Sequence, residues 1–265
     1  MVKYYLIKEQ GIAFTLWIKN KIDKSKNYDF MIFLHGLPSH PYQHNPAKLE
    51  HFFDKNIILV FPNYIGTWAS EGVMSWESCV KTIIRTIDII KKKSVKTIDN
   101  QRLKWDLNRI ILVGNSFGGS IALVAGAKSK DINFIISVAA PTNWENHSRF
   151  NDEKAEPIEE LYYKIKKGWT NLWRIPNMKE WQRLVKGVAD INPIDYINIL
   201  KNKNIFLLHG EKDHVVVSKR SKELFSLLKK GKGHHKLKII DEEHIGYNAF
   251  SDKELSSELF SWLDI

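Results

Sequence analysis

One short segment constrains the fold of this chain more than any other. A glycine-flanked serine, Gly114-Asn115-Ser116-Phe117-Gly118-Gly119, separates the apolar run 109–113 from a second apolar run, 120–125. This order predicts a buried strand, a sharp turn and a helix, which is the setting of a nucleophile elbow. A serine on such a turn needs small residues two positions before and after it, and glycines stand at both places. We therefore expect Ser116 to be a nucleophile, the alternative being an ordinary turn with a capping serine.

A serine nucleophile needs a base and an acid that orients the base, and at such elbows they follow in the order Ser, Asp or Glu, His. Two later apolar runs, 204–208 and 236–240, indicate strands, and each leads into a polar loop. Sites in open α/β sheets lie at the carboxyl ends of the strands. We therefore expect Asp213, in the first loop, to be the acid and His244, in the second, to be the base. Glu211 is a weaker rival for the acid.

The donors for an oxyanion are expected at two places. A tetrahedral oxyanion needs two fixed N–H groups, commonly one from the residue after the nucleophile and one from the loop after an early strand. Phe117 is the first candidate. The run 29–34 indicates an early strand and is followed by His35-Gly36-Leu37-Pro38. Proline has no N–H, so the second donor is either Gly36 or Leu37.

Four strings together resemble the α/β-hydrolase superfamily, and within it the prolyl-oligopeptidase-like serine peptidases and related esterases. The strings are His35-Gly36-Leu37-Pro38, Pro62-Asn63-Tyr64-Ile65-Gly66-Thr67-Trp68, Gly114-Asn115-Ser116-Phe117-Gly118-Gly119 and His209-Gly210-Glu211-Lys212-Asp213-His214-Val215-Val216. The resemblance covers nearly all of the chain. It implies a Ser116–His244–Asp213 triad. It also implies an oxyanion hole made by the backbone N–H groups of Leu37 and Phe117.

The same resemblance bears on the substrate. The second string is similar to a loop that often lies near the substrate in those peptidases, which makes Tyr64 a candidate substrate-binding residue. Two features depart from the family pattern. No β-propeller precedes the catalytic unit, and Asn115 stands where many of these peptidases carry glycine.

The remaining pattern predicts an α/β-hydrolase fold in a single domain, 1–265. Two leading strands form a hairpin, and strands and helices then alternate, which indicates a mostly parallel sheet of about eight strands with helices on both faces. The alternation breaks over 141–195, where we expect a cap-like insertion of two or three short helices. Its aromatic residues, with Trp144 as the candidate substrate-binding one, either line an apolar pocket or pack the cap onto the body.

Composition excludes several classes of protein. Hydrophobic residues make up 43% of the chain, which is enough for a large core. No run of about eighteen apolar residues is present, so we expect no membrane span. The N-terminus lacks the pattern of a signal peptide, and the single cysteine, Cys79, cannot form an internal disulfide. Both observations favour a cytoplasmic protein.

Neither a cofactor nor a nucleic acid is expected. The net charge is +10, but the lysines are scattered, which is typical of a solvated surface. Nucleotide-binding glycine motifs are absent from the sequence. The histidines at 40, 44 and 51 lack the spacing of a metal site.

These observations lead to one main hypothesis, a serine hydrolase that cleaves carboxylic esters through an acyl-enzyme. Esters are favoured over amides because no gating domain precedes the catalytic unit in this sequence. The alternatives are a serine peptidase or aminopeptidase acting on peptides or aminoacyl amides, and a non-catalytic binding module on the same fold. The expected partner is a small ester or peptide substrate, and the oligomeric state stays open.

Overall fold

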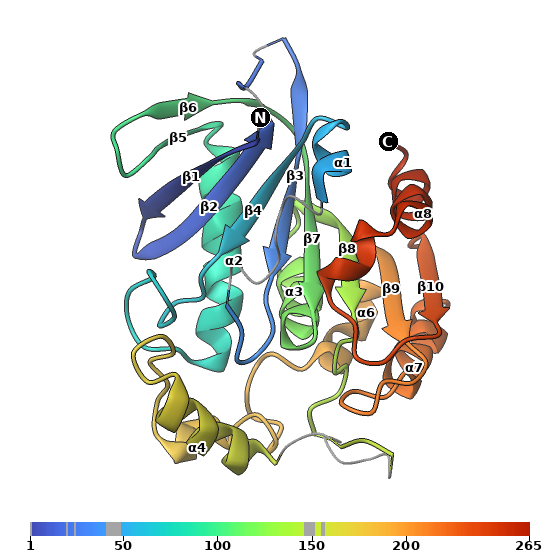
Figure 1. Ribbon diagram of the computed structural model, residues 1–265. Coiled ribbons are helices and arrows are strands. Elements are labelled where there is room, and N and C mark those ends of the chain that lie inside the picture. The colour runs from blue at the N-terminus through green and yellow to red at the C-terminus, as the bar shows by residue number, and fades with distance from the viewer. Residues whose placement is uncertain (1, 20, 24, 41–48, 146–151, 155–156) are drawn as a thin grey trace.

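An eight-stranded sheet runs through the middle of the molecule, with strands in the order β1-β2-β4-β3-β7-β8-β9-β10 (Figure 1). The computed structural model describes residues 2–19, 21–23, 25–40, 49–145, 152–154 and 157–265. The strands are β1 (Val2–Glu9), β2 (Ile12–Lys19), β3 (Asn27–Leu34), β4 (Ile57–Pro62), β7 (Asp106–Asn115), β8 (Ile132–Val138), β9 (Asn204–Gly210) and β10 (His235–Ile240). β2 is antiparallel to both β1 and β4, and from β4 to β10 all neighbours are parallel. The predicted mostly parallel α/β sheet is confirmed.

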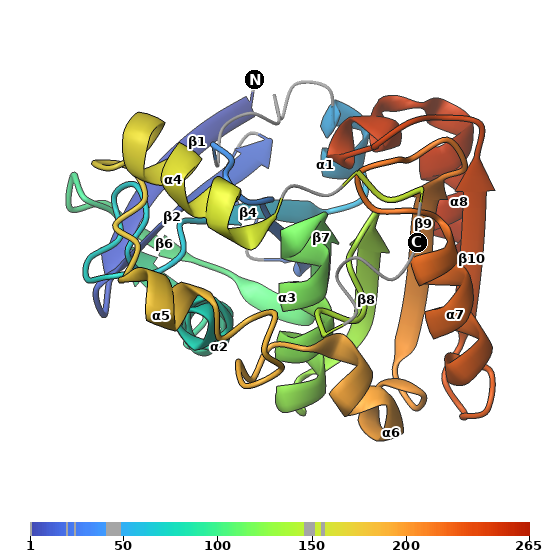
Figure 2. The same cartoon turned by 90° about the horizontal axis from the view of Figure 1, so that it is seen from below.

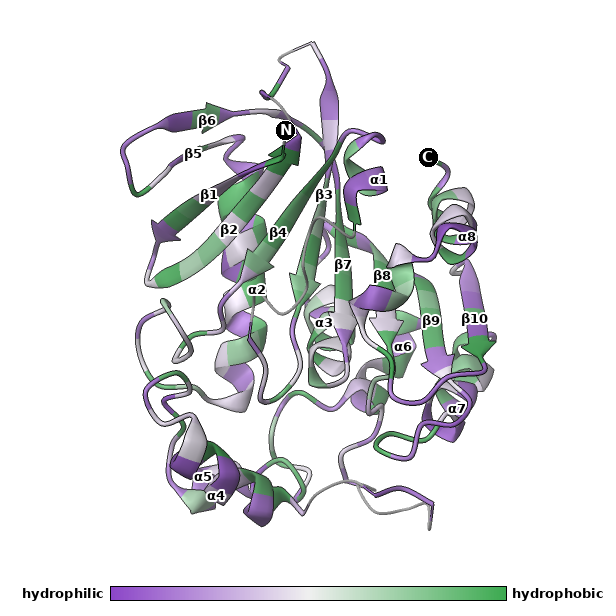
Figure 3. Cartoon of the chain, viewed as in Figure 1, coloured by the Kyte–Doolittle hydropathy of each residue, from purple (hydrophilic) through white to green (hydrophobic). Residues whose placement is uncertain are grey.

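Helices cover both faces of this sheet (Figure 2). One face packs against α2, α3, α6 and α7, and the other against α1, α8 and the short helix η3. The bounds are α1 (Glu50–Phe53), α2 (Trp76–Lys91), α3 (Phe117–Lys128), α6 (Ile197–Leu200), α7 (Lys219–Leu228), α8 (Lys253–Leu263) and η3 (Tyr247–Ser251). Because both faces are covered, the central strands are apolar along most of their length (Figure 3).

Local sequence signals explain where the two central helices begin. α2 starts after Ser75, whose hydroxyl accepts from the Ser78 N–H while the Ser78 hydroxyl accepts from the Ser75 N–H. This reciprocal cap satisfies N–H groups that the first turn leaves without partners. α3 begins directly after the elbow, and the residues from Phe117 to Ala127 are all buried. It packs against β7 and β8 and so fixes the elbow from behind.

Several short helices lie between β8 and β9, in and just beyond the segment 141–195 for which an insertion is expected. They include α4 (Ile158–Gly168), α5 (Met178–Trp181) and the short helix η2 (Pro193–Tyr196). α4 and α5 lie beyond the edge at which the parallel strands end (Figures 2 and 3). This places the insertion on the side of the sheet where the elbow emerges.

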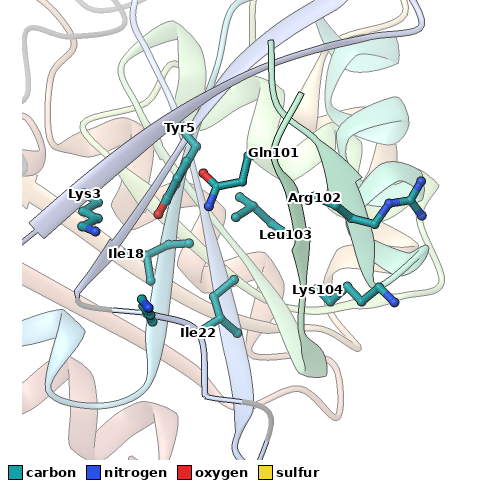
Figure 4. A pocket seen from close by; sticks show the side chains of 9 residues that line it. Lys3, Tyr5, Ile18, Ile22, Gln101, Arg102, Leu103 and Lys104 are labelled. Carbon is teal, nitrogen blue, oxygen red and sulfur yellow. The ribbon is translucent and has the colours of Figure 1, made fainter. Parts of the chain in front are cut away.

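A two-stranded hairpin, β5 (Ser94–Lys96) and β6 (Arg102–Lys104), lies outside the main sheet. Between it and β1–β2 is a hollow of about 380 Å³. Leu103 turns toward Tyr5 there, whereas Arg102 and Lys104 point away (Figure 4). The described residues that line this hollow include no serine, cysteine, histidine or acid, so it holds none of the side chains that acyl transfer needs.

Cys79 is buried in α2 among apolar side chains. Burial is the main cause that raises the pKa of its thiol, and the nearby Glu77 charge adds to the rise. Since the thiolate is the reactive form, we expect a disulfide reagent such as DTNB to modify fewer than about 0.1 equivalents of thiol in the folded protein. One equivalent should react after unfolding in guanidinium. Rapid modification of the folded protein would contradict this burial.

Among the described residues, no helix combines the length and the apolar character needed to cross a membrane.

Candidate active site

Ser116 occupies a strained turn between β7 and α3. Its backbone has φ 51° and ψ −127°, a conformation that residues with a side chain rarely adopt. The Ser116 N–H donates to the Val138 carbonyl at 2.8 Å, and its carbonyl accepts from the Gly119 N–H at 2.9 Å. These bonds from β8 and α3 hold the turn, and the side chain is only half-buried. The predicted elbow geometry is therefore present.

The two glycines of the elbow are required by close backbone approaches. A Cβ on Gly114 would lie 2.1 Å from the Gly118 carbonyl oxygen, and a Cβ on Gly118 would lie 2.0 Å from the Leu34 carbonyl oxygen. Both distances are far below contact distance, and the second partner is the backbone of β3. The elbow can thus form only where these positions lack side chains.

We expect Gly118→Ala to cost about 1–3 kcal/mol of stability, since the added methyl must push α3 away from β3. Ser116 should be displaced with it, because the elbow moves. Gly168→Ala is the matched control: Gly168 lies at the end of α4, and an added methyl would have nothing within 4 Å, so the Tm should equal or exceed that of the wild type. Thermal unfolding of the two variants measures the difference, and equal Tm values would contradict the clash.

The loop after β3 lies directly beside the elbow. A Cβ on Gly36 would come within 3.6 Å of Ser116 Cβ, so this backbone is in contact with the serine. Leu37 lines the same pocket as Ser116 and Phe117. Phe117 is the first residue of α3, where helix geometry gives the N–H no partner within the helix. Both predicted oxyanion donors therefore belong to the immediate surroundings of the serine.

The predicted acid and base are hydrogen-bonded to each other. His244 Nδ1 lies 2.6 Å from Asp213 Oδ2, with the carboxylate completely buried. Backbone bonds join the two loops, since the Lys212 N–H donates to the Glu242 carbonyl at 2.9 Å. Gly210 allows this approach: a Cβ there would lie 2.0 Å from the Glu243 carbonyl oxygen. The loops after β9 and β10 thus form one unit around the acid–base pair.

Two backbone N–H groups and two imidazole nitrogens lie around the Asp213 carboxylate. Oδ1 accepts from the N–H groups of Val215 and Val216, both at 2.9 Å, and Oδ2 faces His244 and, at 3.2 Å, His209 Nε2. Burial alone would raise the pKa of Asp213. The hydrogen bonds from the two histidines outweigh burial and hold that pKa well below its usual range. The lowered pKa favours the ionised carboxylate beside the imidazole.

Glu211, the alternative candidate for the acid, lies away from His244. Glu211 is half-exposed and pairs with Lys222 at 3.0 Å, and it accepts from the Ser218 hydroxyl. The hydrogen bond from Lys222 is the main cause that lowers the pKa of Glu211. Of the two acids expected from the sequence, only Asp213 contacts His244.

Two observations relate the acid–base pair to the serine. β7, β9 and β10 are parallel, so the residues that follow them emerge at one edge of the sheet (Figure 1). Three residues after His244, the buried Tyr247 lies against the elbow strand. It packs in one apolar cluster with Phe33 of β3 and Val113 of β7, and its ring meets Phe33 edge to face. The segment after His244 therefore packs against the two strands that lead to the elbow and its neighbouring loop.

A pocket of about 500 Å³ opens beside the serine. Its wall is mostly apolar, and the described lining residues include Leu37, Pro38, Phe117, Trp144, Ile158, Leu161, Trp169, Val215 and Val216 together with Ser116. Charged groups at its wall are Glu153, Lys154, Lys164 and Arg220. Volume and lining are typical of a site for a small organic molecule.

The aromatic residues of the insertion divide between two roles. Trp144 and Trp169 line the pocket. Trp173 and Trp181 are completely buried, and the Trp181 indole N–H donates to the Ile158 carbonyl at 2.7 Å. Both alternatives expected for the cap aromatics therefore occur, in different residues.

Tyr64 is placed differently from the expectation. It has no exposed surface, and its hydroxyl donates to the His35 carbonyl at 3.0 Å. Its ring packs against His35 and Phe117. Tyr64 therefore supports the loop after β3 from behind and does not line the pocket.

Two buried polar residues at the site, His209 and Arg220, were not expected from the sequence. His209, at the end of β9, faces Asp213. Arg220 forms a two-pronged ion pair with Glu153, at 2.8 and 2.6 Å, within the pocket wall. A histidine directly before the glycine at a strand end was a usable signal for the first. Arg220 pairs with Glu153, which is far away in the sequence, so no local pattern could indicate this ion pair.

Within the described residues, no group of three or more His, Cys, Asp or Glu side chains is arranged to hold a metal ion. Of the three histidines considered for metal binding, His44 lies outside the described residues.

Comparisons with known proteins agree with this architecture. The profile of the prolyl oligopeptidase family matches residues 88–265. An esterase of Pyrococcus furiosus is 18% identical with a TM-score of 0.67, the match covering 100% of this chain and 90% of that chain. Est1E from Butyrivibrio proteoclasticus is 15% identical with a TM-score of 0.64 over 99% of both chains. The acylaminoacyl peptidase of Pyrococcus horikoshii is 16% identical with a TM-score of 0.65, over 98% of this chain and 41% of that chain. No curated protein matches in sequence.

The α/β-hydrolase fold and the family match define the class of the protein, a serine hydrolase. Because the matched region spans more than half of its length, the chain belongs to the prolyl oligopeptidase family.

Proposed function

We propose that the protein hydrolyses carboxylic esters, with Ser116 as nucleophile, His244 as general base and Asp213 as orienting acid. The observation that carries the proposal is the buried Asp213–His244 hydrogen bond of 2.6 Å, at the sheet edge where the strained Ser116 turn emerges. A nucleophile, a base and a group that orients the base are the parts that acyl transfer needs.

In this mechanism the His244 Nε2 takes the Ser116 proton as Oγ attacks the ester carbonyl carbon. The carbonyl π electrons move to oxygen, and the backbone N–H groups of Leu37 and Phe117 bind the resulting oxyanion. The intermediate collapses, the carbon–oxygen bond to the alcohol breaks, and His244 protonates the departing alkoxide. Water, deprotonated by His244, then attacks the carbonyl carbon of the acyl-enzyme. The second intermediate collapses, the carbon–Oγ bond breaks to release the acid, and His244 returns the proton to Ser116 Oγ.

The pocket favours an apolar acyl or alcohol group of moderate size. Trp144 and Trp169 offer aromatic faces beside Ser116, and the remaining apolar wall lies within the same 500 Å³ space. Est1E is described with ferulic acid bound, which is an aromatic acid. We therefore expect aryl and short-to-medium acyl esters to be turned over faster than highly polar ones.

A fluorophosphonate probe tests the chemistry directly, because it labels an activated serine without requiring the natural substrate. The wild type should be labelled, and Ser116→Ala should not. Labelling that persists undiminished in Ser116→Ala would overturn the assignment. A panel of p-nitrophenyl esters and aminoacyl p-nitroanilides then separates ester from amide cleavage by kcat/KM.

The second candidate is cleavage of aminoacyl or peptide amides. It is favoured by the family, which is named for a peptidase, and by the similar fold of an acylaminoacyl peptidase. A kcat/KM for aminoacyl anilides above that for every ester in the panel would establish it. A folded protein that neither reacts with the probe nor turns over any substrate would favour the third candidate, a binding module.

We also propose a cytoplasmic location. The support is the buried single thiol, Cys79, which suits a reducing compartment. Fractionation of the native host, with antibody detection, measures it.

A further inference from the structure

We propose that His209 is a second positioning residue of the site, which shares the Asp213 carboxylate with His244 and fixes the plane of that carboxylate. The proposal rests on the proposed function, since it concerns how the acid of that triad is held. Acyl transfer itself requires only one imidazole on the acid, so the second one needs a separate explanation.

The ring of His209 is completely buried at the end of β9. Its Nε2 lies 2.6 Å from the Val216 carbonyl oxygen and 3.2 Å from Asp213 Oδ2. Both neighbours of Nε2 are acceptors, so this nitrogen must carry the hydrogen. The N–H donates to the Val216 carbonyl, and the carboxylate oxygen lies beside this bond.

The opposite ring nitrogen is fixed by α7. Nδ1 lies 2.7 Å from the Ser221 hydroxyl oxygen, and Ser221 is buried in the first turns of that helix. With the hydrogen on Nε2, the neutral ring accepts at Nδ1 and Ser221 donates. Both nitrogens thus have defined partners, and the ring cannot rotate without losing one of them.

The Asp213 carboxylate accepts from the N–H groups of Val215 and Val216 at Oδ1 and meets His244 Nδ1 at Oδ2. His209 acts on this arrangement at two points. Its Nε2–H holds the carbonyl of Val216, the residue whose N–H donates to Oδ1, and its ring edge lies 3.2 Å from Oδ2. His209 therefore fixes the peptide that binds one carboxylate oxygen and packs against the other, so the carboxylate cannot rotate away from His244.

The expected result concerns kcat more than KM. In His209→Leu the N–H is lost while the side-chain volume is roughly kept, and we expect kcat to fall about 10-fold to 10²-fold because the acid, and with it His244, is less well placed. KM should stay within about twofold, since His209 does not line the pocket. His209→Gln retains an N–H donor near the position of Nε2 and should restore most of the lost kcat.

A readout without turnover separates this proposal from the proposed function. The wild-type proton between His244 and Asp213 should give a downfield ¹H resonance, and this resonance should shift in His209→Leu and return toward its wild-type position in His209→Gln. The proton is observed in the resting protein, so the test holds even if no substrate is cleaved. Ser221→Ala, which frees Nδ1, provides a milder variant if His209→Leu does not fold, and it should shift the same resonance.

The proposal is overturned if His209→Leu keeps both the kcat and the downfield resonance of the wild type. It is also overturned if His209→Gln is as impaired as His209→Leu, or if kcat in these variants and in Ser221→Ala falls only in proportion to the folded fraction measured by circular dichroism. Those outcomes would make His209 a packing residue of β9.

Discussion

Ser116→Ala is expected to lower kcat toward p-nitrophenyl esters by about 10⁵-fold to 10⁶-fold, because no covalent intermediate can then form. The residual rate should still exceed the rate in water, since the backbone N–H groups that we propose as oxyanion donors and the pocket are untouched. Stability should change little, because the backbone bonds that hold the turn come from main-chain atoms. Initial rates and thermal unfolding measure the two quantities.

The control for this substitution is Ser226→Ala, on the exposed side of α7, where the hydroxyl only donates to the Lys222 carbonyl. It should have wild-type kcat and full fluorophosphonate labelling. A Ser116→Ala protein with more than about one hundredth of the wild-type kcat would show that another group supplies the nucleophile.

Asp213→Asn is expected to lower kcat by about 10⁴-fold with the fold intact. The amide would donate a hydrogen to His244 Nδ1, so the imidazole hydrogen would move to Nε2 and the base could no longer accept the Ser116 proton. The substitution is nearly isosteric, and Oδ1 can still accept from the Val215 and Val216 N–H groups. The loss of activity should therefore lie in kcat, while Tm at neutral pH should fall modestly, because the stabilising charge of the Asp213 carboxylate is removed.

Glu211→Gln is the matched control, since it makes the same chemical change two residues earlier in the same loop. Glu211 pairs with Lys222 on the surface and does not touch His244, so its kcat should stay within about twofold of the wild type. The reverse outcome, an impaired Glu211→Gln and an active Asp213→Asn, would transfer the role of the acid to Glu211.

The stability of the fold should depend on pH through Asp213. The pKa of Asp213 is lowered in the folded protein, so this group stabilises the fold above its ordinary pKa and loses that contribution only as the pH falls through its lowered value. Between about pH 4 and pH 7 Asp213 therefore stays ionised. We expect its contribution to stability to stay constant in this range and to be lost only at lower pH. Thermal unfolding followed by circular dichroism as a function of pH, in the wild type and in Asp213→Asn, measures this contribution.

Much of the fold could be predicted because its central strands are continuous apolar runs, such as 109–113 and 204–208, that end at glycine. The hairpin β5–β6 could not. Each of its strands has three residues, with one buried side chain between exposed or partly exposed ones, which is too short for a period to emerge.

The site also has a part that the sequence predicts and a part that it does not. The positions of Ser116, Asp213 and His244 depend on strand ends, which local sequence marks well. The role of Tyr64 depends on which way its hydroxyl turns, and here it turns inward to the His35 carbonyl. The separate roles of Trp144 and Trp181 likewise depend on contacts with distant segments, which local patterns do not encode.

Val215 and Val216, which follow Asp213 in the loop after β9, contribute to the site in two separate ways. Both residues line the pocket beside Ser116, while their main-chain N–H groups donate to the Asp213 carboxylate. Any amino acid except proline supplies the same N–H, so side chains at positions 215 and 216 can be exchanged to reshape the pocket wall while the backbone bonds to Asp213 are kept. Randomised libraries at these two codons would be a natural starting point for redirecting the enzyme.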